Sequence, residues 1–361
     1  MAVFRAFKAL RPTEEKATAV AALPYDVVNR EEAAAIGKEN PDSFLHVDRA
    51  EMDLPAETDL YDAKVYQKAK ENLHKMEETG VLVQDNKPCY YIYELVRKGK
   101  VQTGIAGCAS IVDYLNNVVK KHELTRSDKE LDRINHVDVC DANTGPIYLA
   151  CRYTDALSAL LEQWKKEHKA TYDFTEEDEI THRVWVIDGD EAISQIQGEM
   201  EKIPALYIAD GHHRAASAVK VGLKRRQENP DYTGEEAFNY FLSVVFSYDQ
   251  LTILAYNRVV RDLNGQSVED VLEKIKENFD MTIVPGYPAK PVEKHCFGMY
   301  LDGFWYLLKA KPELYEGKDV VGQLDAQILQ DVVLGPVLGI GDPRSDKRIK
   351  FVGGSHKLRE L

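Results

Sequence analysis

Five consecutive residues, Asp210-Gly211-His212-His213-Arg214, bring together side chains that bind anions and move protons. The guanidinium of Arg214 is a planar fork of donors that matches the oxygens of a phosphate or a carboxylate. The imidazoles of His212 and His213 can donate hydrogen bonds or transfer protons near neutral pH. Asp210 can hold a metal ion or a proton, and Gly211 allows the backbone to approach a ligand closely. These five residues predict a site for an anion such as phosphate or a carboxylate.

A strand followed by a helix is expected to position these five residues. The apolar run 203–209 has the length and composition of a buried strand, and small apolar residues recur at helical spacing from Arg214 onward. The start of a helix attracts anions through unpaired N–H groups and the helix dipole. In the alternative interpretation, Asp210 only caps the helix, while one histidine is packed and the other is solvated.

A second polar cluster contains His122, Glu123 and Thr125, flanked by two lysines and an arginine. Neighbouring cations keep a carboxylate such as Glu123 ionised, and they attract anionic substrates. The cluster is not a zinc-protease motif, because no histidine stands at position 127. A solvated basic loop explains these residues equally well.

Three predicted connections supply the remaining candidates. Tyr25 and Asp26 follow a proline that favours a turn, although alone they are better explained as an ordinary strand-to-helix joint. Asn143 and Thr144 expose an amide and a hydroxyl in a turn before Gly-Pro. Arg258 leaves a predicted strand and can clamp a carboxylate or a phosphate.

The overall charge narrows the class of partner. The 361 residues include 46 basic and 60 acidic side chains, which give a net charge of −14. This charge argues against binding to nucleic acid or to an anionic membrane surface, and it leaves small anionic molecules as partners of a locally basic site. Five cysteines without metal-ligand spacing, no membrane-spanning run and no signal peptide predict a cytoplasmic protein with buried thiols.

Hydrophobic periodicity and turn residues predict the surrounding elements. A loop leading into a short strand is expected at 41–48, and a β-hairpin is expected from strands 239–246 and 251–256. A second hairpin is expected from strands 90–95 and 103–112, and a third, with an Asp-Gly turn, at 299–306. Helices are expected at 30–37, 61–78, 155–164, 191–201 and 324–333, and one that runs to residue 279 behind a capping box at Ser267 and Asp270.

Seven segments carry a resemblance to a known family. They are Pro24-Tyr25-Asp26-Val27, His122-Glu123-Leu124-Thr125, Asn143-Thr144-Gly145-Pro146, Ala209-Asp210-Gly211-His212-His213-Arg214, Tyr256-Asn257-Arg258-Val259-Val260-Arg261-Asp262-Leu263, Asp342-Pro343-Arg344 and Phe351-Val352-Gly353-Gly354. In this order they resemble the bacterial and archaeal family catalogued as domain of unknown function 1015. Members usually continue well past the Val-Gly-Gly segment, so we expect that any site residue from such a tail is missing from this sequence.

The Asp-Gly-His-His-Arg motif is also similar to that of free-serine kinases with the sulfiredoxin/ParB fold. This likeness implies an α+β protein with a mixed-sheet core of that type at residues 90–262. It also implies an N-terminal α/β segment at 1–89 and a C-terminal α/β extension at 263–361. The implied reaction is phosphorylation of L-serine to O-phosphoserine, with Mg²⁺ and with pyrophosphate, ADP or ATP as donor. No Walker-type or Gly-x-Gly-x-x-Gly segment identifies the donor.

The same residues can be given roles from the chemistry of phosphoryl transfer. The catalytic candidates are Glu123, which can accept the proton of the hydroxyl, Asp210, which can hold Mg²⁺, and His213. Arg258 could pair with the carboxylate of the amino acid. The candidates for binding phosphate or substrate are Tyr25, Asp26, His122, Thr125, Asn143, Thr144, Gly211, His212, Arg214 and Arg258.

Two other functions fit the residues. The first is a non-enzymatic regulator that binds a nucleotide or phosphate. The second is a metal-dependent hydrolase that uses His122, His212 and His213, although adjacent histidines seldom face the same way. The direction of a serine-phosphorylating reaction depends on concentrations and donor, and not on sequence.

Overall fold

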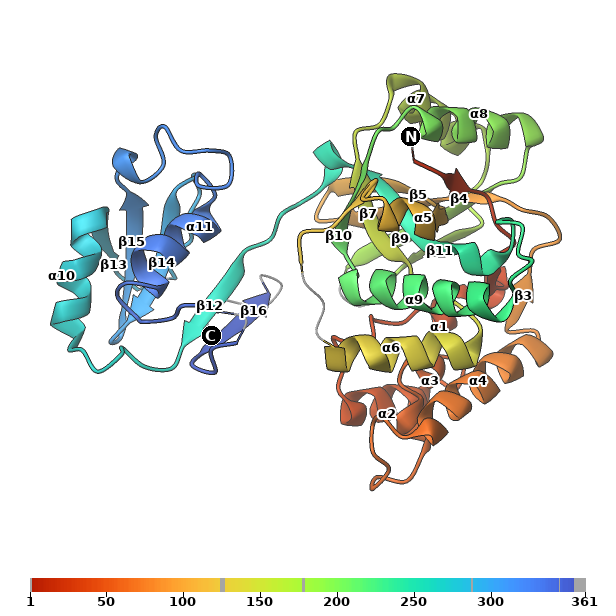
Figure 1. Cartoon of the computed structure of the whole chain (residues 1–361), viewed down its shortest axis with the longest axis horizontal. Helices are drawn as coiled ribbons and strands as arrows, with labels where there is room; N and C mark the ends of the chain where they lie inside the picture. The colour runs from red at the N-terminus through yellow and green to blue at the C-terminus, as the bar shows by residue number, and fades with distance from the viewer. Residues whose placement is uncertain (1, 124–126, 177–178, 287, 344, 354–361) are drawn as a thin grey trace. The chain divides into compact units, whose positions relative to one another are not determined.

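The computed structural model describes the whole chain except residues 1, 124–126, 177–178, 287, 344 and 354–361. The chain divides into two compact units, Met1–Leu251 and Thr252–Leu361. Both units combine helices with β-sheet, so the protein is an α+β protein with one large mixed sheet and several small ones (Figure 1). None of the described helices is both long and apolar enough to cross a bilayer.

Nine described strands of the first unit form one mixed sheet. Its order is β6-β10-β7-β11-β5-β4-β9-β8, and β1 also pairs with β5. β10 is parallel to β6 and β11 is parallel to β7, whereas the other neighbours are antiparallel. The strands are β1 (Phe4–Arg5), β4 (Tyr90–Arg97), β5 (Lys100–Ser110), β6 (Val119–Lys120), β7 (Ile147–Cys151), β8 (Tyr172–Thr175), β9 (Ile180–Ile187), β10 (Leu206–Asp210) and β11 (Tyr240–Ser247).

Helices cover both faces of this sheet. Figure 1 shows α7 (Asp155–Glu167) and α8 (Asp190–Glu201) on one side, and α9 (His212–Glu228) with α6 (Ser127–Cys140) on the other. Leu157 of α7, Ile196 of α8 and Ala215 of α9 all belong to one buried core that includes the sheet. The remaining elements of this unit are β2 (Leu10–Pro12), β3 (Leu82–Gln84), α1 (Ala17–Val20), α2 (Arg30–Glu39), α3 (Leu45–Asp48), α4 (Ala63–Glu78), α5 (Ile111–Leu115) and the 3-10 turns Glu14–Lys16, Ala50–Asp53, Ala237–Asn239 and Tyr248–Gln250.

Caps fix several helix starts where the sequence predicts them. The side chain of Asn29 accepts from the backbone N–H of Glu32, whose carboxylate accepts from the N–H of Asn29, so a capping box opens α2. Thr154 caps α7 through the N–H of Leu157. The predicted inner stripe of α4, which includes Ala69, is buried. The predicted helices at 30–37, 61–78, 155–164 and 191–201 and the hairpin of β4 and β5 are confirmed.

The second unit contains a three-stranded antiparallel sheet and a two-stranded ribbon. Ser267 and Asp270 form the predicted capping box of α10, and the Asp-Gly turn joins β14 to β15 as predicted. The predicted helix at 324–333 is α11 continued by a π-helical turn. The elements are β12 (Tyr256–Val260), α10 (Val268–Asn278), β13 (Phe279–Val284), β14 (Cys296–Leu301), β15 (Phe304–Ala310), the 3-10 turn Pro312–Leu314, α11 (Asp325–Leu329), the π turn Gln330–Leu334 and β16 (Ile349–Gly353).

Two predicted elements are wrong. The strand expected at the end of 41–48 is helix α3, where buried Leu45 and Val47 imitate the alternation of a strand. The hairpin expected over 239–256 does not form, because β11 has β5 and β7 as its two neighbours. Residues 251–255 are not a strand, and β12 pairs with β16 in the second unit.

Candidate functional site

A tight turn between β10 and α9 carries the Asp-Gly-His-His-Arg residues. β10 ends at Asp210, Gly211 is the N-cap in a left-handed conformation with φ 91°, and α9 begins at His212. Glycine suits this position because a side chain is strained at such a φ. A Cβ on Gly211 would also lie 3.1 Å from the guanidinium of Arg214. The strand and turn are as predicted, and the helix begins two residues earlier than its periodicity indicates.

The short strand β6 brings the second polar cluster to this turn. β6 runs parallel to β10, with Val119 opposite Leu206, so the two strands end at the same edge of the sheet. Beyond that edge, Oε2 of Glu123 lies 3.5 Å from Nδ1 of His212. The ring of His122 meets the ring of His212 edge to face, with centroids 4.4 Å apart.

The three side chains differ in their exposure to solvent. The side chain of His212 is 5% exposed, whereas those of His122 and Glu123 are 62% and 61% exposed. Burial and the nearby His122 lower the pKa of His212, although Glu123 and Asp210 act in the opposite direction. The imidazole of His212 is therefore mostly neutral near pH 7. Its Nε2 is buried and has no hydrogen-bond partner among the described residues.

Arg214 uses its guanidinium within the protein. Nη2 donates to Oδ2 of Asp210 at 2.6 Å, and Nη1 donates to the carbonyl of Pro146. Arg214 therefore connects the 210–214 turn to the loop before β7. Sequence reasoning assigned this fork to a ligand phosphate, and the structure shows that two of its donors bind the chain itself.

The loop that Arg214 holds contains two other predicted residues. Thr144 donates from its hydroxyl to Oδ1 of Asp48 at 2.6 Å, and this contact ties the loop to the end of α3. Asn143 lies next to it and is partly buried. Tyr25 lies under the guanidinium of Arg133, which is 4.2 Å from the centre of its ring.

The surroundings of Tyr25 affect its ionisation. Burial raises the pKa of Tyr25, while the charges of Arg133 and Arg214 act in the opposite direction. Its neighbour Asp26 is exposed. Tyr25 is therefore a neutral phenol within the electrostatic reach of the Arg214 turn.

Three further predicted site residues remain to be placed. Thr125 lies outside the described residues. Arg258 is on β12 in the second unit, where it donates to the carbonyl of Tyr256 and its guanidinium lies 5.4 Å from the ring centre of Phe351. His213 is on the first turn of α9 and is partly buried.

Sequence reasoning missed the polar inner face of α6. Glu130, Arg133, His136 and Cys140 are buried at helical spacing between α4 and α9. Arg133 pairs with Asp132 at 2.7 Å, and Nε2 of His136 lies 3.1 Å from the carbonyl of Val47. The spacing of these residues is that of one helix face and could have indicated a buried face. A search for apolar residues at that spacing does not find it, because three of the four side chains are polar.

The donor atoms of His122, Glu123 and His212 all lie within 4.8 Å of one another, so this group could hold a metal ion. Asp210 is exposed, and its carboxylate has a second oxygen besides the one that pairs with Arg214. Mg²⁺ prefers oxygen ligands, so Asp210 fits Mg²⁺ better than the histidines do.

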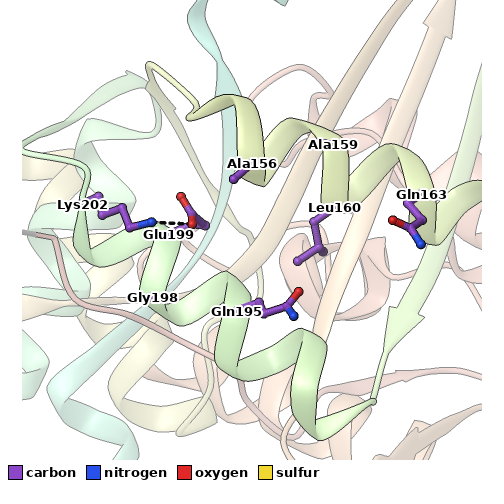
Figure 2. A pocket seen from close by; sticks show the side chains of 8 residues that line it. All are labelled: Ala156, Ala159, Leu160, Gln163, Gln195, Gly198, Glu199 and Lys202. Atoms are coloured by element: carbon purple, nitrogen blue, oxygen red, sulfur yellow. Dashed lines mark hydrogen bonds and ion pairs between the residues drawn. The ribbon is translucent and has the colours of Figure 1, made fainter.

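A separate depression lies between α7 and α8, with a cavity volume of about 470 Å³. Figure 2 shows its lining, which includes the ion pair of Lys202 with Glu199 at 2.6 Å. It contains none of the predicted site residues, and α7 and α8 cover the face of the sheet opposite α9 (Figure 1). The candidate site is therefore the polar cluster at the start of α9.

Comparison with known proteins gives one match. No curated protein and no solved structure matches the chain significantly. One family matches residues 4–327 and is described as "Protein of unknown function (DUF1015)". This match covers most of the chain, and it contains the turn at Asp210–Arg214 and the segment with Glu123. The chain belongs to the DUF1015 family.

Proposed function

We propose that the protein is a phosphotransferase that phosphorylates the hydroxyl of a small molecule, with free L-serine as the first candidate. The observation that carries this proposal is the carboxylate of Glu123, 3.5 Å from His212 at the N-terminus of α9. A base thus faces a helix start, and helix starts bind phosphate.

The reaction needs a positioned hydroxyl, a held phosphoryl group and a proton acceptor. The hydroxyl oxygen attacks the terminal phosphorus of the donor, and the P–O bond to the leaving group breaks. The hydroxyl proton passes to Glu123, whose exposed carboxylate can reach a bound substrate. With pyrophosphate as donor the leaving group is phosphate, and with ATP or ADP it is the shorter nucleotide.

The start of α9 supplies donors for the transferring phosphoryl group. The first N–H groups of the helix have no partner inside it, and neutral His212 and neighbouring His213 add ring nitrogens. Arg214 contributes positive charge and holds the turn through Asp210 and Pro146. Asp210 is the proposed ligand for Mg²⁺, which would neutralise charge on the phosphates of the donor.

The finer fold assignment is part of the same proposal. The first unit has a mixed sheet with helices on both faces, which supports a sulfiredoxin/ParB-like core. The expected bounds of that core, 90–262, run past the end of this unit at Leu251 and include β12. The N-terminal segment 1–89 and the extension 263–361 would be additions to that core. A cytoplasmic location, which the cysteine pattern favours, is part of the same proposal. So are small-molecule partners, because the charge of −14 argues against nucleic acid and an anionic membrane surface.

A non-enzymatic regulator that binds phosphate or a nucleotide is the second candidate. The observation in its favour is that Arg214 already bonds Asp210 and Pro146, which reduces the donors left for a transferring phosphoryl group. Such a protein would gain thermal stability with phosphate compounds without forming a product.

One assay separates the two. The protein is incubated with L-serine, Mg²⁺ and pyrophosphate, ADP or ATP, and O-phosphoserine is measured by mass spectrometry. Product that depends on protein and donor supports the phosphotransferase. A thermal shift with the same compounds and no product with any donor would contradict it and support the regulator.

A further inference from the structure

Two imidazoles and one carboxylate converge at the edge of the sheet without forming good hydrogen bonds. Nδ1 of His212 lies 3.5 Å from Oε2 of Glu123, and Nε2 of His122 lies 4.0 Å from Oε1 of the same carboxylate. A charge-assisted hydrogen bond between such groups is about 2.7–2.9 Å long. The three side chains are therefore close neighbours whose separations are too long for direct bonding.

These separations suit a shared metal ion. Zinc binds nitrogen at about 2.0–2.1 Å and carboxylate oxygen at about 2.0–2.2 Å, so tetrahedral ligands lie about 3.4 Å apart. The separation of 3.5 Å between His212 and Glu123 is near this value. His122 and Glu123 are exposed, so small rotations of their side chains can bring the third donor into range.

The buried position of His212 sets one of these ligands. Its side chain is 5% exposed, and Nδ1 is the ring nitrogen that faces Glu123. The buried Nε2 belongs to the other side of the same ring, so its lack of a partner among the described residues is a separate feature from the metal site. The ring of His212 also packs edge to face against His122, which places the two imidazoles beside the carboxylate.

We propose that His122, Glu123 and His212 bind one zinc ion, with an open coordination position toward solvent. Two histidines and a glutamate are a set that zinc accepts with a fourth position left for water or a substrate oxygen. Imidazole nitrogen selects zinc and similar transition metals over Mg²⁺, which prefers oxygen. This donor set differs from that of the hydrolase alternative, His122, His212 and His213, because Glu123 replaces His213.

Zinc binding does not depend on the proposed phosphotransferase. If that function is also correct, zinc on Glu123 competes for the carboxylate lone pairs that would accept the proton of the hydroxyl. The binding test below uses no substrate and no donor, so its failure would leave the phosphotransferase assay unaffected.

The test uses the full chain after treatment with a chelator. Titration calorimetry with zinc chloride is expected to give one site per chain, and cobalt chloride is expected to give the visible absorption of a four-coordinate ion. His122→Ala and Glu123→Gln should each weaken zinc binding at least about 10-fold, since even changes around metal ligands cost that much. Both positions are exposed, and circular dichroism checks that each variant is folded.

His74→Ala is the matched control, because His74 is an exposed histidine on α4. Its zinc affinity should equal that of the unchanged protein. Absence of a stoichiometric site in the unchanged protein would overturn the proposal. Loss of affinity in only one of the two site variants would also overturn it, because three shared ligands require both.

Discussion

Glu123 and His212 lie far apart in the sequence, yet Oε2 of Glu123 is 3.5 Å from Nδ1 of His212. The parallel pairing of β6 with β10 produces this contact, because both strands end at the same edge of the sheet. An exposed carboxylate therefore faces a buried, mostly neutral imidazole at the start of α9. The predictions on activity depend on this pair.

Glu123→Gln should lower the rate of phosphoserine formation by about 10²-fold or more, because an amide cannot accept the proton of the hydroxyl. The measurement is kcat with L-serine and the active donor. Glu57→Gln, which changes an exposed carboxylate elsewhere, is the control and should leave the rate unchanged. An unaltered rate in Glu123→Gln would remove this residue from the role of base.

Arg214→Lys should reduce activity and stability together. A lysine ammonium is one compact donor group, and it does not reproduce the planar fork whose two nitrogens now bond Asp210 and the carbonyl of Pro146. We expect a loss of about 1 kcal/mol in the free energy of unfolding, measured with urea. Arg97→Lys on the exposed end of β4 is the control. Equal stability of both variants and of the unchanged protein would contradict a structural role for the fork.

Gly211→Ala should weaken the site more than an equally strained glycine elsewhere. A side chain at Gly211 would be strained by the backbone φ of 91°, and its Cβ would also lie 3.1 Å from the guanidinium of Arg214. Gly99, with φ 77° and no atom within 4 Å of such a Cβ, is a control for backbone strain alone. Gly99→Ala should cost about 1 kcal/mol, and Gly211→Ala should cost more and lower activity. Similar stability losses would show that Arg214 moves aside freely.

The buried His136 should make the protein less stable as the solution becomes acidic. Burial and the charge of Arg133 lower the pKa of His136 in the folded chain. Below the ordinary histidine pKa of about 6.5 the unfolded chain binds the proton that the folded chain rejects, so stability falls as pH falls. For one proton, the free energy of unfolding can change by up to about 1.4 kcal/mol per pH unit.

His136→Gln tests this effect, with urea unfolding measured between pH 7 and pH 5. The variant should lose less stability over this range than the unchanged protein, even if its free energy of unfolding at pH 7 is lower. His46 acts in the opposite direction, because its hydrogen bond with Asp53 raises its pKa. His46→Gln should therefore steepen the loss, and an unchanged slope in His136→Gln would contradict the prediction.

Local patterns were sufficient where local interactions decide the structure. The apolar run before Asp210 and the small residues after Arg214 predicted the strand, the turn and the helix of the site. Caps at Asn29 and Thr154 fixed helix starts because their bonds span three residues. These contacts lie within a few positions of one another, so a single sequence contains all the information needed.

Long-range contacts explain the failures. Nothing near Arg214 indicates that its fork bonds the carbonyl of Pro146, and nothing in β11 indicates that β5 and β7 will be its neighbours. The inner face of α6 was missed because Arg133 and His136 are buried there although both are polar. The carbonyl of Val47 becomes a neighbour of His136 only in the folded chain.

The strand β6 contains only two residues and forms the outer edge of the large sheet, with β10 as its neighbour. Few interstrand bonds therefore tether the segment that carries Glu123, whereas β10 is flanked on both sides. Edge segments of this kind detach locally at much lower free energy than the centre of a sheet. Amide protons near Lys120 should consequently exchange with solvent long before those of β5, and each such opening withdraws Glu123 from α9 while the rest of the unit stays folded.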